Sequence, residues 1–362
     1  MLCTIFLFNL LSLIFAVPLK TTELKITVEP HIGFLNHLYP ASVLNATQGT
    51  LPYQWSGSLP DGFNLTPRGV LTGFAKAAGT HSLTVTDSTG ASASTSLTIV
   101  DSSTSSTSYK LTISSVSLNG IVTQQIVTTT NSKIQFKANY QIVAADWCPG
   151  CMEQIQIGFS FGLPQGCIYS GGPGLAGATG TGAMELTAPP TPGRYYIAFD
   201  RSQDMQCRHT HQNWWHGMPS PANIIAAVDV IDAPDVKLNN GVQVSNVQIN
   251  SVPVHHNTMP SGTYTVEFTY SVVSTPDRTQ QLQVGLSSDD QPLDSCIYSA
   301  INPGTGFSKL SFKAPQLRSR YYLSIQTSME LECVANWVCK KCSADQKPGN
   351  NFHQIIGVID VN

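Results

Sequence analysis

Apolar and polar residues alternate along most of the chain, and this alternation is the pattern of β-strands. Runs such as 154–158, 264–272 and 321–326 place every second side chain on the same face. Clusters of Gly, Pro, Asn and Asp separate these runs, as turns require. We find no convincing amphipathic helix between them. The pattern therefore predicts an all-β protein.

Residues 109–232 and 236–362 are two copies of one unit, because the same landmarks recur in the same order. The matched segments are 154–158 with 281–285, 167–170 with 296–299, 194–196 with 320–322, 213–214 with 336–337, and 224–230 with 355–361. Units of this length with many short strands are typical of β-sandwiches. The predicted fold is three tandem immunoglobulin-like β-sandwiches, the second and third forming an internal repeat.

The first sandwich is expected at residues 23–100, where the motif differs from that of the repeat. Its landmarks, in chain order, are Trp55, Leu59-Pro60-x-Gly62, Gly69-x-Leu71-x-Gly73 and Ala78-Gly79. This segment resembles a family of immunoglobulin-like domains of surface proteins, which is similar to the cadherin-like domains of dystroglycan. The resemblance covers this domain alone. It implies a spacer or adhesive module, with Trp55 in the core and calcium at Asp61 or Asp87 as a further option.

The ends of these units are predicted from composition. Residues 1–16 contain an apolar run too short to span a membrane, followed by Ala16, and we interpret them as a signal peptide. Residues 101–108 are all Asp, Ser or Thr and are expected to form a flexible linker. No later segment has the length of a transmembrane helix. We therefore expect a secreted, extracellular protein.

Charge and sequons narrow the partners. Charged residues make up only 11% of the chain and the formal net charge is −3, which argues against a nucleic-acid partner. Asn45-Ala46-Thr47 and Asn64-Leu65-Thr66 are acceptor sequons for N-glycosylation, so Asn45 and Asn64 are candidate glycan-bearing residues; chance occurrence is the alternative.

Eight cysteines remain after the leader and predict four disulfides in an oxidising compartment. The repeat matches one pair in each copy and leaves two local pairs. The predicted bridges are Cys167–Cys207, Cys296–Cys333, Cys148–Cys151 and Cys339–Cys342. The segment 147–151 also has the Trp-Cys-x-x-Cys form of a redox motif. The strand pattern that follows it favours a structural bridge.

The segment 205–218 is the densest stretch of candidate chemistry. Trp215 is the best candidate for an exposed ligand contact, because the neighbouring Trp214 is repeated, as Trp337, and is expected to pack against the neighbouring disulfide. His209, His211 and His216 could hydrogen-bond a polar ligand. They are also weak candidates for a zinc or copper site, although no carboxylate accompanies them.

The preferred interpretation is a binding, adhesion or matrix protein, not an enzyme. It would recognise glycans or cell-surface proteins through its tandem disulfide-bonded sandwiches, and no cofactor is expected. No hydrolase motif supports a catalytic role. The alternative is a metal-dependent (zinc or copper) or redox enzyme centred on the first copy.

Overall fold

The computed structural model describes 23–101, 105–144, 151–172, 176–203, 207, 214, 217, 219–232, 236–237, 242–253, 256–260, 262–272, 280–286, 298–300, 304–328 and 355–362. Among these residues there is no α-helix, and the single helical element is the 3₁₀ turn η1 (Pro221–Asn223). The prediction of tandem β-sandwiches is confirmed. The segment 1–16, predicted to be a signal peptide, lies outside the described residues. The described residues contain no helix with the length and apolarity of a membrane span.

The first sandwich surrounds a core that contains Trp55, whose side chain is almost fully buried. One sheet has the order β2-β9-β8-β5, a second contains β3-β7-β6, and β1 pairs with β4. The strands are β1 (Lys25–Val28), β2 (Gly33–Phe34), β3 (Leu38–Val43), β4 (Asn45–Thr47), β5 (Gln54–Gly57), β6 (Phe63–Leu65), β7 (Val70–Phe74), β8 (Gly79–Thr86) and β9 (Ser92–Val100).

The second sandwich packs the sheet β10-β11-β14-β17 against the sheet β13-β19-β18-β15-β16, with β12 paired to β11. Strands with one buried face alternate, as in β14, whereas β15 and β19 are buried along their whole length. The strands are β10 (Ser105–Ser108), β11 (Leu111–Leu118), β12 (Ile121–Val122), β13 (Gln125–Thr129), β14 (Lys133–Ile142), β15 (Glu153–Phe159), β16 (Pro164–Gly171), β17 (Thr179–Thr187), β18 (Gly193–Ser202) and β19 (Ile224–Ile231).

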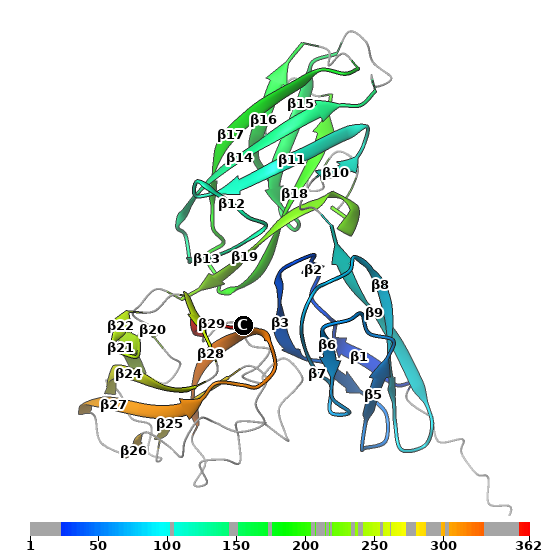
Figure 1. Ribbon diagram of the computed structural model, residues 1–362. Coiled ribbons are helices and arrows are strands. Elements are labelled where there is room, and N and C mark those ends of the chain that lie inside the picture. Colours follow the sequence, from blue (N-terminus) through cyan, green and yellow to red (C-terminus); the bar gives the residue numbers. More distant parts are fainter. Residues whose placement is uncertain are drawn as a thin grey trace, which may run out of the picture.

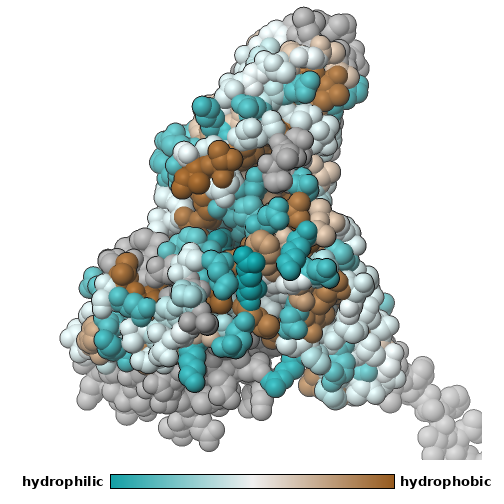
Figure 2. Space-filling view, in the orientation of Figure 1, coloured by the Kyte–Doolittle hydropathy of each residue, from teal (hydrophilic) through white to brown (hydrophobic). Residues whose placement is uncertain are grey.

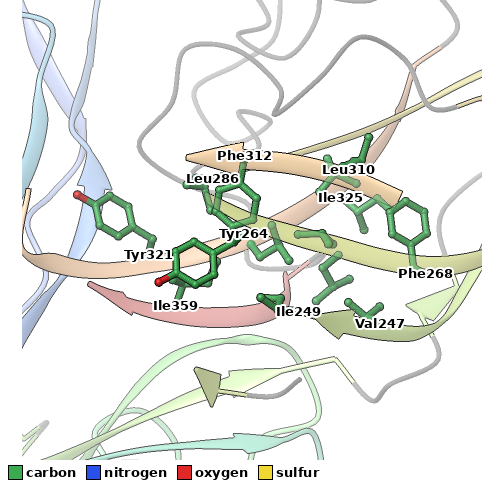
Figure 3. Close-up of a cluster of buried hydrophobic side chains, with 14 of the residues drawn as sticks. Val247, Ile249, Tyr264, Phe268, Leu286, Leu310, Phe312, Tyr321, Ile325 and Ile359 are labelled. Carbon is green, nitrogen blue, oxygen red and sulfur yellow. The ribbon is translucent and has the colours of Figure 1, made fainter. Parts of the chain in front are cut away.

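The third sandwich repeats this topology strand for strand, which is the structural form of the sequence repeat. Its sheets are β20-β21-β24-β27, with β22 on β21, and β23-β29-β28-β25-β26, around the core shown in Figure 3. The strands are β20 (Val236–Lys237), β21 (Val242–Ile249), β22 (Val252–Pro253), β23 (His256–Met259), β24 (Thr263–Val272), β25 (Gln280–Leu286), β26 (Tyr298–Ala300), β27 (Gly304–Lys313), β28 (Ser319–Ser328) and β29 (Ile355–Val361).

The expectation of a flexible linker at 101–108 is wrong for its second half. Residues 105–108 form β10, which pairs with β11 through four consecutive antiparallel residue pairs. Polar side chains do not prevent this, because the edge of β11 offers backbone partners whatever side chains the incoming strand carries.

In each copy of the repeat, a tyrosine on one strand lies opposite a glycine on the neighbouring strand. Tyr140 lies opposite Gly180, and Tyr270 lies opposite Gly306. In each case a methyl group built on the glycine would collide with the tyrosine ring. The ring therefore covers the bare backbone, a pairing that stabilises a strand containing glycine.

The three sandwiches meet near the middle of the molecule (Figure 1). There β19 and β29 lie close together, and β28 makes a parallel contact with β3 of the first sandwich at Arg320 and Pro40. Hydrophilic residues gather on the visible surface around this meeting point (Figure 2). Several buried charged side chains of the described residues lie at this junction.

Candidate functional site

The predicted ligand contacts Trp215, His209, His211 and His216 lie outside the described residues. Within the same segment, Trp214 is described and its side chain is buried. It packs in a cluster with Ile224 and with Phe34 of the first sandwich, among others. Trp214 thus contributes to the contact between two sandwiches.

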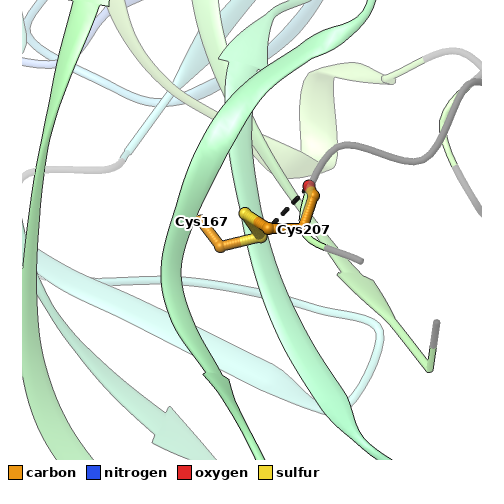
Figure 4. Close-up of a disulfide and its surroundings, with 2 residues drawn as sticks. All are labelled: Cys167 and Cys207. Atoms are coloured by element: carbon orange, nitrogen blue, oxygen red, sulfur yellow. Dashed lines mark hydrogen bonds between the residues drawn. A yellow bond between two sulfur atoms is a disulfide. The ribbon is translucent and has the colours of Figure 1, made fainter. Parts of the chain in front are cut away.

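The described residues contain a disulfide between Cys167 on β16 and Cys207, the pair that the repeat predicts (Figure 4). The Cys167 Sγ atom lies 3.2 Å from the carbonyl oxygen of Cys207. Cys151 is also disulfide-bonded. Its predicted partner, Cys148, lies outside the described residues. The same is true of Cys296, Cys333, Cys339 and Cys342.

A groove of about 740 Å³ runs beside this disulfide. Its polar groups largely satisfy one another. Lys133 Nζ lies 3.0 Å from Glu185 Oε1, and the Gln165 amide exchanges two hydrogen bonds with the backbone of Thr187, of 3.0 and 2.7 Å. These contacts join β14 and β16 to β17.

Four charged side chains are buried where the second and third sandwiches meet. Arg194 Nη1 on β18 donates to both carboxylate oxygens of Asp229 on β19, at 2.9 and 3.0 Å. Arg320 on β28 instead binds Asp360 on β29 through two nitrogens, with Nε donating to Oδ1 at 2.7 Å and Nη2 donating to Oδ2 at 2.8 Å. The two ion pairs occupy matching positions of the repeat, so each sandwich contains its own copy.

The two ion pairs are joined across the repeat boundary. Arg320 Nη1 donates to Asp229 Oδ2 at 2.6 Å, and the Tyr322 hydroxyl donates to Asp229 Oδ1 at 2.7 Å. His256, on β23, extends the chain, with Nε2 at 2.6 Å from Asp360 Oδ2. We call these residues the junction network: Arg194, Asp229, Arg320, Tyr322, Asp360 and His256.

Burial and charge act in opposite directions on the carboxyl groups of the network. Burial raises the pKa of Asp229, but the adjacent Arg194 and Arg320 guanidinium groups lower it below its ordinary value. Burial also raises the pKa of Asp360, and the hydrogen bonds from Arg320 and His256 lower it further than burial raises it. The carboxylates are therefore ionised at neutral pH and balance the guanidinium charges.

The first sandwich attaches to the same junction. The Ser319 hydroxyl at the start of β28 donates to the Tyr39 carbonyl at 2.6 Å and accepts from the Gly73 N–H at 3.2 Å. The Ile32 N–H donates to the hydroxyl of Tyr196, whose ring lies beneath the Arg194 guanidinium. All three sandwiches thus share one set of contacts.

Tyr195 and Tyr321 have a local structural role that the repeat indicates. Each hydroxyl donates to the backbone carbonyl four residues earlier, Thr191 at 2.7 Å and Leu317 at 2.8 Å. Such bonds fix the turn that enters β18 and β28. The Arg-Tyr-Tyr motif therefore combines a turn anchor with two residues directed at the junction.

A second buried ion pair lies inside the second sandwich. Arg201 on β18 binds the Glu153 carboxylate through two nitrogens and donates from Nη1 to the Ala144 carbonyl at 2.7 Å. Both side chains are almost fully buried. This ion pair lies at the start of β15, two residues after Cys151.

The remaining predicted sites belong to the first sandwich. Asn45 and Asn64 both lie in strands, β4 and β6, and are half-buried. The Asp87 carboxylate accepts hydrogen bonds from the Thr50, Thr89 and Ala91 N–H groups and from the Thr89 hydroxyl, which lower its pKa to about 2. Its oxygens stabilise a turn. Within the described ranges, no three potential metal ligands gather in one place.

The junction network was not predicted from the sequence, although one signal was present. Asp229 and Asp360 are the sole charged residues in two otherwise apolar strands, and each aligns with an arginine one strand away in both copies. A repeated charge in a buried strand indicates an ion pair. The cross-repeat bonds carry no such signal, because they depend on how the copies face one another.

No known family model matches the sequence, and no curated protein matches it. Solved structures with some likeness include the Escherichia coli adhesin FdeC, at 12% identity and a TM-score of 0.20, covering 95% of this chain and 98% of that one. Invasin, a bacterial integrin-binding protein, has 11% identity and a TM-score of 0.21, over 84% of this chain and 57% of that one. The Bacteroides ovatus protein SGBP-B, in complex with a mixed-linkage heptasaccharide, has 12% identity and a TM-score of 0.18, over 94% and 70%. Likeness at this level assigns neither a family nor a function.

Proposed function

We propose that the protein is a secreted binding or adhesion protein that recognises glycans or cell-surface proteins. The observation that supports this most is the junction network, which joins two sandwiches of the same topology through buried ion pairs. Breaking such pairs is costly, so the sandwiches keep a fixed relation. A fixed pair of similar domains presents two similar surfaces, and two weak contacts then give a much stronger attachment.

The first sandwich fits this proposal as a spacer. It is held to the third through Ser319 and the β3–β28 contact. Its resemblance to immunoglobulin-like domains of surface proteins is in keeping with that role. The disulfide of Cys167 and Cys207 would stabilise the fold outside the cell, where thiols are oxidised.

Two screens on the full-length chain test the proposal. A glycan array reports on sugar partners, and a pull-down from biotinylated cell surfaces reports on protein partners. The proposal expects saturable binding in at least one of them. Absence of saturable binding in both would contradict it, provided that circular dichroism shows the chain to be folded.

A further inference from the structure

The outer face of the sheet β10-β11-β14-β17 carries a grid of uncharged polar side chains. One row across the strands contains Ser114, Asn139 and Thr181, which are directly opposite one another. The next row contains Thr112, Gln141 and Thr179 in the same relation. These six residues line a hollow of about 530 Å³, together with Tyr140 and Gly180. Strands β11, β14 and β17 lie side by side in the upper lobe of Figure 1.

The grid has the chemistry of a surface that binds neutral hydroxyl groups. Each side chain in the two rows carries a hydroxyl or a carboxamide group, which can donate and accept hydrogen bonds. Neighbouring strands lie about 4.8 Å apart, so the groups repeat at a regular interval. Asn139 is already oriented, because its Oδ1 accepts from the Thr181 hydroxyl at 2.7 Å. Gln141 and Thr179 are exposed to solvent.

The lining of the hollow is uncharged. Lys137 is exposed on the same face of β14, two residues before Asn139, but it does not line the hollow. A charged ligand confined to the hollow would find no ion pair in its lining. A neutral, hydroxyl-rich ligand would find donors and acceptors in both rows. Sugars without carboxylate, sulfate or phosphate groups fit that description.

The matching face of the third sandwich keeps the grid and adds an aromatic ring. Gln243, Ser271 and Thr305 form one row, and Ser245 and Thr269 begin the other. That second row ends at Phe307, opposite Thr269, where the repeat has Thr181 in the first copy. Phe307 is 64% exposed. Its ring is not needed for the shared fold, since a threonine occupies the same position in the other copy.

An exposed ring beside hydroxyl and amide groups is suited to a sugar. The ring offers an apolar surface to the C–H face of a pyranose, and the neighbouring polar groups can bond its hydroxyls. The closest charges in the described part of this face, Lys309 and Glu267, neutralise one another at 2.6 Å. The face therefore remains electrically neutral near Phe307.

We propose that these two outer faces are binding sites for a neutral glycan, one in each copy of the repeat. This inference rests on the proposed binding function and identifies the ligand class and the surface. The junction network joins the two sandwiches that carry these faces. The same faces would give no selectivity for acidic glycans.

The test uses the full-length chain on an array that carries neutral, sialylated and sulfated oligosaccharides. The double variant Asn139→Ala/Gln141→Ala removes two groups of the first grid, and Phe307→Thr gives the third sandwich the residue of the second. Gln135→Ala is the matched control, because Gln135 is exposed on the same face of β14 outside the hollow. All four changes are at exposed positions, so melting temperatures should stay close to the wild type.

We expect neutral oligosaccharides to bind, with the affinity of the altered site falling about tenfold in each of the two site variants and binding staying unchanged in the control. Binding restricted to acidic oligosaccharides, or neutral binding that neither site variant weakens, would overturn this inference but leave the proposed function standing. Capture of a cell-surface protein without any glycan binding would do the same. If the wild-type chain binds neither glycans nor cell-surface proteins, both proposals are wrong.

Discussion

Substituting Asp229 should loosen the molecule more than any other single change at the junction. Its side chain is 1% exposed and accepts from Arg194, Arg320 and Tyr322. Asp229→Ala leaves two buried guanidinium groups without their shared counter-charge. Removing one partner of a buried ion pair costs about 3–5 kcal/mol. For a domain of this size that free energy corresponds to a fall in melting temperature of roughly 10 °C or more.

A surface ion pair provides the control for this substitution. Glu185 lies 3.0 Å from Lys133, but its side chain is 46% exposed. Glu185→Ala should therefore cost less than about 1 kcal/mol, because solvent screens exposed pairs. Both variants remove one carboxylate from an ion pair, and they differ chiefly in burial and in the number of partners.

Differential scanning calorimetry and urea unfolding of the full chain measure the two effects. Small-angle X-ray scattering adds a second readout, since Asp229→Ala also removes the hydrogen bonds that Arg320 and Tyr322 make across the repeat boundary and should increase the radius of gyration. A loss for Asp229→Ala no larger than that for Glu185→Ala, with unchanged scattering, would refute the reasoning that the network fixes the sandwiches.

Three further results are expected from titratable and oxidisable groups. Burial, and to a smaller extent the Arg194 charge, lower the pKa of His31 to about 4. The free energy of unfolding should therefore fall by about 1–3 kcal/mol as the pH drops from 6.5 to 4. His31→Gln should flatten this pH dependence in urea unfolding, and an unchanged dependence would contradict the prediction. Burial raises the pKa of Asp232 to about 7, so its ionisation weakens the fold as pH rises from 4 to 7; Asp232→Asn should raise the melting temperature at pH 8 and not at pH 4, whereas equal shifts at both would count against it. Removing the bridge with Cys167→Ser/Cys207→Ser should cost about 4 kcal/mol in the chain-entropy model for a separation of 40 residues, and an unchanged unfolding midpoint would rule that out.

The architecture was largely predictable because alternation and repetition are local signals. Matching segments around Arg194 and Arg320 align as β18 and β28, and the final strands align as β19 and β29. A buried strand needs apolar residues throughout, and a half-buried strand needs them at every second position. Both patterns are present in the sequence before folding.

Three-dimensional relations between the copies were beyond the sequence. The bond from Arg320 to Asp229 joins residues 91 positions apart in different sandwiches. The grid is equally hidden, because Thr, Ser, Asn and Gln appear as ordinary solvent-facing residues until the strand registers place them in rows. The prediction concentrated on His209, His211 and His216 because rare residue types attract notice, whereas a surface made of common residues does not.

Titration calorimetry of the full-length chain with the best neutral oligosaccharide from the array tests the central claim most directly. If each copy of the repeat has a glycan site on its outer face, a short oligosaccharide should bind with a stoichiometry of about two per chain, and Asn139→Ala/Gln141→Ala should weaken one of the two sites about tenfold. A stoichiometry of one that is unaffected by substitutions on either face would contradict the account.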